Sequence, residues 1–447
     1  MQKLVVKSQF MGVKPCVIEI HRFLLLIGEQ ASGKSTIAKL IYFFQTLPDA
    51  IYKSTLLNQG RGNFDYILDI NSIARSTFVD TFGLTTRSEG VFDIEFWYNE
   101  SSYLNIHQGE KDRLVYAKFE ENMGFNLGGV VRKFIQTPRG TDVENIFTRE
   151  FLLKGLSAIF NQANTNFNYI IAGRNTVVAY PDLIGEKVRS ELEKLVEDEV
   201  REQDFEKKKR RGNEMLFLEF VNWSEGIRKY FRTNGGTFDR VVRQQQLQNK
   251  DALAILIKIT KKILKGKYES NDSGESLIPD GSRVPIDFKD ASSGQQEVLR
   301  ILQGLFVSIG TTNRKEFLVV EEPEAHLYPL AQKELVNAFA VFLNTIQEGR
   351  IVITTHSPYI LACVNILLFA QYVSNQIGKS NHNGSLADVS DAYWLDAAFF
   401  NAYSLSNSDA YCQDIKDAET GLIDQNYLDL ISEQLGLQYH QLYQMLD

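Results

Sequence analysis

The feature that most constrains the fold is a glycine-rich loop between an apolar run, residues 23–27, and a helical pattern over residues 35–44. The loop reads Gly28, Glu29, Gln30, Ala31, Ser32, Gly33, Lys34, Ser35 and Thr36. It follows the phosphate-binding pattern G-x-x-x-x-G-K-[ST] and stands between a strand and a helix, as that pattern requires. Backbone N–H groups of such a loop, with the positive end of the helix dipole, bind phosphate. We predict that Lys34 binds the β- and γ-phosphates of ATP and that Ser35 ligates Mg²⁺.

Two adjacent carboxylates, Glu321 and Glu322, end a second apolar run, residues 317–320. Neighbouring strand residues point to opposite faces of a sheet, so the two acids cannot do the same work. We predict that Glu321 holds Mg²⁺ through water and that Glu322 is the general base that polarises the attacking water. Taken alone, a strand that ends in two glutamates is also common at helix starts and solvent edges.

A third apolar run, residues 351–355, ends in His356. An isolated histidine is more often structural. At the tip of a strand that follows the acid pair, however, it suits a γ-phosphate sensor that stabilises charge in the transition state.

A polar stretch precedes the apolar helical pattern of residues 298–307, and it consists of Ser292, Ser293, Gly294 and Gln295. Either serine can cap the helix, whose N-terminus is then a second phosphate site. Read alone, this is an ordinary capped helix. Its position shortly before the acid pair favours a function at the nucleotide.

The order of these motifs resembles the ABC ATPase heads of the SMC, Rad50 and overcoming-lysogenization families. The resemblance implies that the stretch from Ser292 to Gln295 is the signature that crosses to the ATP of a partner head. Ala291 stands where the family usually has Leu, and Glu321 stands where most P-loop ATPases have Asp. Residues 323–327 match the family's D-loop, a segment that contacts the other head.

Two features of that family remain open in this sequence. Its glutamine loop has two candidates, Gln136 and Gln162. Arg174, at the end of an apolar run, resembles an arginine that is frequent in the bacterial defence branch of the family, and its role is open.

The expected fold class is α/β, an ABC-type P-loop ATPase head with a mixed sheet flanked by helices and interrupted by a short antiparallel helical arm. The expected boundaries are an N-terminal lobe over residues 1–180, the arm over 181–267, a C-terminal lobe over 268–365 and a helical tail over 366–447. The arm is predicted from a change to Glu, Lys and Arg with a thin apolar seam. Its basic run, residues 207–211, is expected at the tip or in a nearby loop, as a solvated turn or as a phosphate- or partner-binding patch.

Bulk composition restricts the function classes. The net charge of −8 disfavours coating of nucleic acid by bulk attraction, although a local basic patch leaves DNA contact open. The three cysteines, Cys16, Cys363 and Cys412, have no metal-site or disulfide spacing. No apolar run reaches the roughly 18 residues that cross a bilayer, and the N-terminus lacks a signal-peptide core, so a cytoplasmic protein is expected.

The motifs also resemble the ATPase subunits of the PARIS and Septu anti-phage systems. This resemblance implies a homo-oligomer of head-to-head dimers that senses a phage-derived trigger and holds or releases a separately encoded effector nuclease, Toprim-like or HNH-like. The alternative is an SMC- or RecF-like DNA-repair ATPase, which the short arm disfavours. A transporter motor is disfavoured by the arm and tail. A nuclease within this chain is also disfavoured, because the acids after His356 never form Asp-x-Asp.

Overall fold

The computed structural model describes residues 1–59, 66–83, 91–111, 114–137, 142–161, 165–179, 205–311, 315–377, 385–406 and 410–424, without the side chains of 66–69, 142–148 and 205–214. A six-stranded sheet runs through the middle of the molecule. Its strand order is β16 (Cys412–Asp414), β15 (Phe400–Leu405), β3 (Phe23–Gly28), β12 (Arg350–Thr355), β11 (Lys315–Glu321) and β7 (Thr165–Ile170). Neighbours pair in parallel, except for β15 and β16.

Helices cover both faces of this sheet, which is why β3, β11 and β12 are nearly continuous apolar runs. Alternate residues of β11 belong to two different cores: Phe317 and Val319 to one, Leu318 and Val320 to the other. The predicted α/β class, a mixed sheet flanked by helices, is confirmed.

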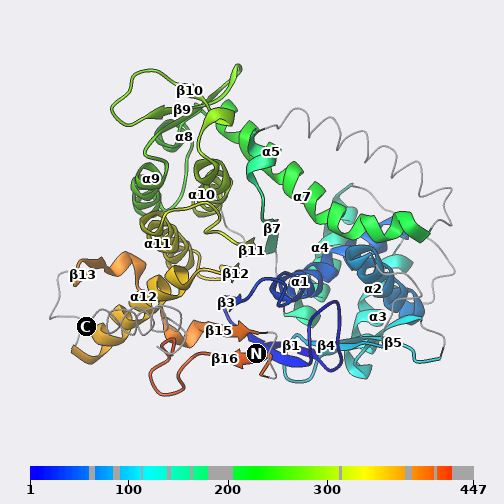
Figure 1. Cartoon of the computed structure of the whole chain (residues 1–447). Coiled ribbons are helices and arrows are strands. Elements are labelled where there is room, and N and C mark those ends of the chain that lie inside the picture. Colours follow the sequence, from blue (N-terminus) through cyan, green and yellow to red (C-terminus); the bar gives the residue numbers. More distant parts are fainter. Residues whose placement is uncertain are drawn as a thin grey trace, which may run out of the picture.

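The first core lies between helices and a second, antiparallel sheet, which is seen below these helices in Figure 1. That sheet has the order β2 (Cys16–Ile20), β1 (Gln2–Val6), β4 (Asp93–Trp97), β5 (Tyr103–Gln108) and β6 (Val115–Phe119). Its strands alternate between buried and more exposed residues, as expected for a sheet with one face toward the core. The helices on this side are α1 (Lys34–Leu57), α2 (Tyr66–Phe82), α3 (Glu121–Gln136) and α4 (Asp142–Phe160).

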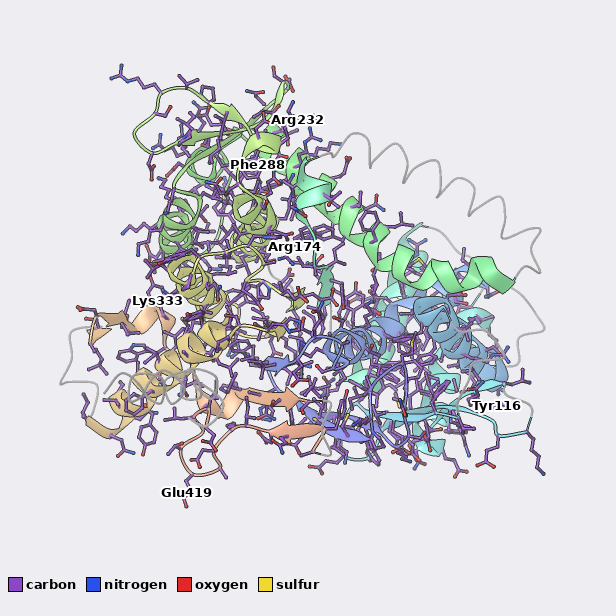
Figure 2. The ribbon with its side chains drawn as sticks, viewed as in Figure 1. Tyr116, Arg174, Arg232, Phe288, Lys333 and Glu419 are labelled. Carbon is purple, nitrogen blue, oxygen red and sulfur yellow. The ribbon has the colours of Figure 1, made fainter. Side chains whose placement is uncertain are left out.

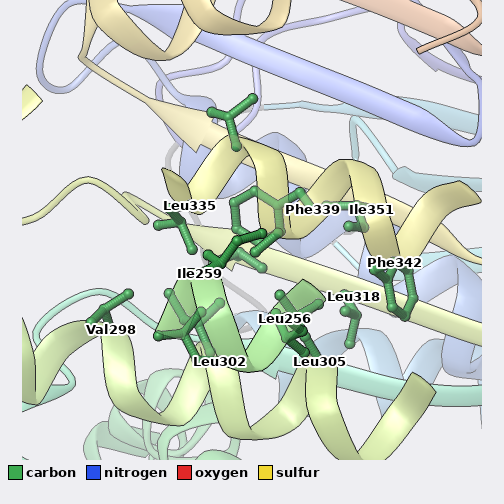
Figure 3. Close-up of a cluster of buried hydrophobic side chains, with 14 of the residues drawn as sticks. Leu256, Ile259, Val298, Leu302, Leu305, Leu318, Leu335, Phe339, Phe342 and Ile351 are labelled. Carbon is green, nitrogen blue, oxygen red and sulfur yellow. The ribbon is translucent and has the colours of Figure 1, made fainter. Parts of the chain in front are cut away.

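The second core lies on the opposite face of the central sheet. It is built by α9 (Lys250–Leu264), α10 (Ser293–Thr311), α11 (Pro329–Thr345) and α12 (Pro358–Ile377). Figure 3 shows Leu256 and Ile259 of α9 between side chains of α10 and α11. Helix α9 falls within the expected arm, residues 181–267, but its apolar stripe is part of the core.

The rest of the described arm segment also packs on the head. Residues 181–204 lie outside the described residues, and α7 (Phe205–Thr233) lies along α2, β7 and α10. Two short helices are α5 (Asn175–Ala179), before this segment, and α8 (Phe238–Gln244), after α7. The basic run 207–211, expected at a tip or loop, falls within α7, and its side chains are outside the described ones.

A small antiparallel sheet follows α9. The strands β8 (Gly266–Asn271) and β9 (Gly274–Pro279) pair antiparallel, and β10 (Ile286–Asp287) joins them before the short helix η1 (Phe288–Asp290). Asn271, Asp272 and Ser273 are exposed at the turn of this hairpin, whereas Glu275 of β9 is buried.

The tail is not simply helical, which corrects another prediction. After α12 the described chain forms β13 (Ser385–Leu386), β14 (Val389–Ser390), η3 (Asp391–Tyr393), η4 (Ala397–Phe399), β15 and β16. Strand β15 extends the central sheet beside β3, with Leu405 opposite Gly28. Residues 400–405 become a strand because β3 offers an unpaired edge there. Residues 425–447 lie outside the described part.

Helix α12 is the only described helix long and apolar enough to cross a membrane by length and composition. This is weak evidence, because a core helix passes the same test. Its residues Ile360, Leu361 and Val364 are buried in the second core.

Gly304 offers a test of the packing of α7 on α10. A Cβ there would lie 2.6 Å from Cζ2 of Trp223 on α7, whereas a Cβ at the exposed Gly129 of α3 would meet nothing within 4 Å. We expect Gly304→Leu to lower the free energy of unfolding by roughly 1–3 kcal/mol through overpacking. Gly129→Leu should be neutral or stabilising, because leucine has the higher helix propensity. Thermal unfolding of both variants measures this, and equal melting temperatures would contradict the packing of α7.

Candidate functional site

The phosphate-binding loop joins β3 to α1, as predicted. At positions 28 and 33 of the loop, contacts from other parts of the chain leave room only for glycine. A Cβ on Gly28 would lie 1.9 Å from the carbonyl oxygen of Leu405. A Cβ on Gly33, which has a φ of 89°, would lie 2.7 Å from the Tyr411 hydroxyl. That hydroxyl donates a hydrogen bond to the carbonyl of Ser32 at 2.8 Å. The tail thus supports the loop from behind.

Lys34 lies folded into the loop rather than extended into solvent. Its Nζ donates to the carbonyls of Gly28 (2.9 Å) and Glu29 (2.7 Å) and to Ser32 Oγ (3.3 Å). Burial lowers the pKa of Lys34, an effect that the nearby carboxylate of Glu322 opposes. The ammonium group is therefore held among loop oxygens, in the position where it would contact a phosphate of bound ATP.

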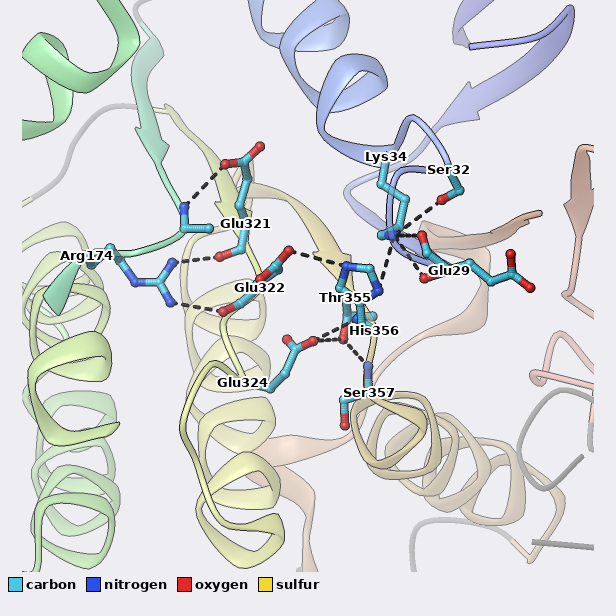
Figure 4. A network of polar contacts seen from close by, with 12 residues as sticks. Glu29, Ser32, Lys34, Arg174, Glu321, Glu322, Glu324, Thr355, His356 and Ser357 are labelled. Atoms are coloured by element: carbon cyan, nitrogen blue, oxygen red, sulfur yellow. Dashed lines mark hydrogen bonds and ion pairs between the residues drawn. The ribbon is translucent and has the colours of Figure 1, made fainter. Parts of the chain in front are cut away.

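His356 connects Lys34 to the second acid (Figure 4). Its Nδ1 lies 3.5 Å from Lys34 Nζ, and its Nε2 lies 3.3 Å from a carboxylate oxygen of Glu322. An ammonium group can only donate and a carboxylate can only accept, so both contacts fit a neutral imidazole with its proton on Nε2. The strand order β3, β12, β11 explains this row, because each of the three residues follows one of these strands.

Glu324, which sequence reasoning did not single out, orients His356. One of its carboxylate oxygens accepts hydrogen bonds from the backbone N–H of His356 (2.8 Å) and from Thr355 Oγ1 (2.6 Å). The acid lies in the segment 323–327 that was identified only as a contact to a second head. A carboxylate two residues after the acid pair is the signal that could have identified it.

Glu321 lies on the face of the sheet that carries α1. Tyr169, on the neighbouring strand β7, donates to its Oε1 at 2.7 Å, and the backbone N–H of Ala172 donates to Oε2 at 3.3 Å. Burial raises the pKa of Tyr169, so its hydroxyl stays protonated and donates. These bonds leave carboxylate lone pairs for further ligands, so Glu321 and the partly exposed Ser35 fit a Mg²⁺ ion as oxygen donors. The magnesium role stays a prediction.

The predicted signature begins α10. Gln295 N–H points to Ser292 Oγ at 3.4 Å, so Ser292 caps the helix, and both serines are exposed. A Cβ on Gly294 would lie 2.5 Å from the carbonyl oxygen of His326, which packs this glycine against residues 323–327 of its own chain. Gln295 binds Ser292 and the carbonyl of Leu264, so its side chain acts within its own chain. The two serines are the groups that a second copy can reach.

The structure describes one of the two glutamine-loop candidates. Gln136 is the last residue of α3, and Gln162 lies outside the described residues. The turn that follows β7, beside the acid strand, contains Gly173 and Arg174 instead. Arg174 is fully buried in the interior of the molecule (Figure 2).

A cavity of about 540 Å³ lies beside Tyr169, the residue that donates to Glu321. It is bounded by α1, α2, β7 and α7, and polar side chains such as Asp49, Lys53 and Glu219 line it. No residue of the phosphate-binding loop lines it, so it is not the nucleotide site.

Comparison with known proteins agrees with a nucleotide-binding domain in part of the chain. Residues 229–361 match the family model of the AAA ATPase domain. The matched residues include α9, α10, β11 and β12. A comparison with curated proteins found no match.

Several solved structures are similar at low scores. An SMC head domain with an extended coiled coil from Pyrococcus furiosus, bound to the C-terminal domain of ScpA, has 13% identity and a TM-score of 0.39, and the match covers 93% of this chain and 96% of that one. The SMC head domain from Thermotoga maritima has 11% identity and a TM-score of 0.35, over 92% and 97%. A dimeric ATP-binding cassette bound to ADP and phosphate has 11% identity and a TM-score of 0.26, over 80% and 90%. At these scores the likenesses carry no functional argument.

The position of Lys34 predicts its role in nucleotide binding. Lys34→Ala removes the ammonium group that the loop oxygens hold, and we expect it to weaken ATP binding by at least about 30-fold, as loss of a buried charge partner does. Lys118→Ala is a matched control, because Lys118 is exposed on β6. Equilibrium titration with a fluorescent ATP analogue measures both. Wild-type affinity in Lys34→Ala would exclude this loop as the phosphate site.

Proposed function

We propose that the chain is an ATPase of the ABC type, in which two heads close over ATP and Mg²⁺. The observation that carries the proposal is the row of Lys34, His356 and Glu322, with the Lys34–His356 and His356–Glu322 contacts of 3.5 and 3.3 Å, beside a phosphate-binding loop. A lysine for phosphate charge, a carboxylate for a water proton and an imidazole between them are the groups that hydrolysis of a phosphoanhydride needs.

Each residue then has a distinct role. Lys34 neutralises phosphate charge. Glu322 orients the attacking water and accepts its proton. The Nε2–H of His356, which points to Glu322, is available to the γ-phosphate when charge develops there. Mg²⁺, held by Ser35 and through water by Glu321, would supply further neutralisation of the phosphates.

Glu322→Gln separates binding from hydrolysis. The amide keeps the size of the side chain but cannot accept the water proton, so we expect ATP affinity within about threefold of wild type and hydrolysis slower by about 10²–10⁴-fold. The control is Glu419→Gln, because Glu419 lies at the surface far from this site (Figure 2). Phosphate release and ATP titration measure the two quantities. Native turnover by Glu322→Gln would show that Glu322 is not the base.

The cellular role we propose is control of a separately encoded effector nuclease in anti-phage defence, with no nuclease activity in this chain. The motif resemblance supports it, and so does the close packing of the described part of α7 on the head, which differs from a long tethering coiled coil. The same Glu322→Gln variant tests this in cells that carry the chain with its neighbouring genes. With Glu322→Gln, the efficiency of phage plating should rise to the level seen on cells without these genes. With Glu419→Gln, it should stay low. The DNA-repair alternative would be favoured if the wild-type genes gave the cells no protection against phage. It would also be favoured if Glu322→Gln made the cells sensitive to DNA damage instead of to phage.

The two-headed arrangement predicts complementation between defective chains. Gly294→Glu is unsuitable as a partner variant, since Gly294 packs on His326 in its own chain. Ser293→Glu is suitable: Ser293 is exposed at the first turn of α10, where a glutamate stabilises the helix but would repel the γ-phosphate of a partner. Lys34→Ala and Ser293→Glu should each be inactive alone. Mixed dimers keep one intact composite site and should recover up to about half of the wild-type rate if the sites act independently.

Heterodimer formation is verified by dual-tag purification before the rates are measured. Full activity of Ser293→Glu on its own would contradict a signature that acts on the partner's ATP. If no activity returns in verified heterodimers, a crosslink from position 292 to a γ-phosphate analogue on the partner distinguishes coupled sites from a signature that acts in its own chain.

A further inference from the structure

Arg174 joins three segments of the chain through one side chain. It follows β7 after a turn in which Gly173 has a φ of 70°. Its Nη1 donates to the carbonyls of Ile171 (2.7 Å) and Glu321 (2.6 Å), and its Nη2 donates to the carbonyl of Glu322 (3.0 Å). The backbone N–H and Nε of Arg174 bind Glu297 of α10 at 3.0–3.1 Å. The rigid guanidinium fork thus spans the ends of β7 and β11 and the second turn of α10.

Both members of the Arg174–Glu297 ion pair are fully buried, with side-chain exposures of 0% and 1%. A guanidinium keeps its charge in a protein interior, so the pair is held by charge as well as by hydrogen bonds. Such a pair adds little net stability but fixes the relative position of the elements that carry it. A movement of α10 therefore acts directly on Arg174.

The carbonyl that Arg174 holds belongs to a strained residue. Glu322 has a φ of 41°, which is uncommon for a residue with a side chain, and its carboxylate must turn back toward His356. Its carbonyl also accepts the N–H of Ala325 at 3.1 Å. The direction of the carboxylate depends on this backbone conformation, because Glu322 lies after the last paired residue of β11.

The start of α10 touches the same region from the other side. Gly294 packs on the carbonyl of His326, one turn before Glu297, while Ser292 and Ser293 stay exposed. The exposed end of α10 is the part that a second head can contact. Its buried part is tied to the carbonyls of the two acids.

We propose that Arg174 is a positioning residue that couples α10 to Glu322. The bridge from Glu297 through Arg174 to the Glu322 carbonyl keeps the general base aimed only while α10 holds its place, so that contact of a second head with α10 sets the rate of hydrolysis. This inference rests on the proposed ATPase function. It adds to that function a route by which contact with the partner head changes hydrolysis at the ATP site of this head.

Arg174→Lys tests the coupling. Lysine keeps the positive charge near Glu297 but cannot bind the carbonyls of Glu321 and Glu322 in a fork. We expect kcat to fall about 10–100-fold, the effect of a small misplacement of a catalytic group. The affinity for ATP and the KM should stay within about threefold, because Arg174 contacts no part of the phosphate-binding loop in the described structure.

Arg300→Lys is the matched control. Arg300 lies one turn further along α10, is equally buried and forms a forked pair with Glu275 of β9 at 2.6–2.7 Å, with no contact to the acids in the described residues. It should lower the melting temperature about as much as Arg174→Lys and leave kcat within about threefold of wild type. Loss of kcat in both variants alike would reduce Arg174 to a structural role and overturn the proposal.

Three further outcomes test the proposal. Wild-type kcat in folded Arg174→Lys would also overturn the coupling. If that variant does not fold, Glu297→Gln against Glu275→Gln replaces the pair, and only Glu297→Gln should lower kcat, by about threefold or more. Absence of ATP hydrolysis by the wild-type chain would instead refute the proposed function, which separates the two failures.

Discussion

The parallel pairing of β3, β12 and β11 is the constraint on which the rest of the site depends. Ile27 pairs with Thr355, and Thr354 pairs with Glu321, so the carboxyl ends of the three strands lie at one edge of the sheet. Ligand sites of parallel sheets form at that edge, because the loops that leave it converge there. The middle position of β12 places His356 between Lys34 and Glu322. An order with β11 directly beside β3 would leave His356 outside this row instead of between the lysine and the base.

Helix α10 is the second organising element, since it carries two buried ion pairs on successive turns. Arg300 binds Glu275, which ties α10 to the hairpin β8–β9, and Glu297 binds Arg174, which ties it to the acid strand. Buried pairs of this kind repay their desolvation only with good geometry and further hydrogen bonds, and both have them. The Arg300–Glu275 pair fixes the helix relative to the hairpin, and the Arg174–Glu297 pair fixes it relative to the acid strand. The burial of α10 over most of its length accords with this.

The phosphate-binding loop is supported from a distant part of the chain. Strand β15 pairs with β3, and Tyr411 binds the loop at Ser32. These contacts close the space behind Gly28 and Gly33, which explains why a side chain at either position cannot be accommodated. The loop's motif is local in sequence, but the residues that pack behind it lie almost four hundred positions away along the chain.

The sequence by itself determined the local parts of this protein: the loop with Lys34, the acid pair, the histidine that ends β12 and the cap of α10. Each of these depends on residues within a few positions of one another, so periodicity and capping rules reach them. Tertiary structure alone decided that α9 is core, that residues 400–405 join the central sheet, that Glu324 orients His356 and that Arg174 bridges α10 to the acids. An apolar stripe does not show which surface it packs against. A short segment of mixed residues, such as 400–405, forms a strand only where the edge of a sheet is open to it. A buried arginine binds partners on elements that are far apart in the chain.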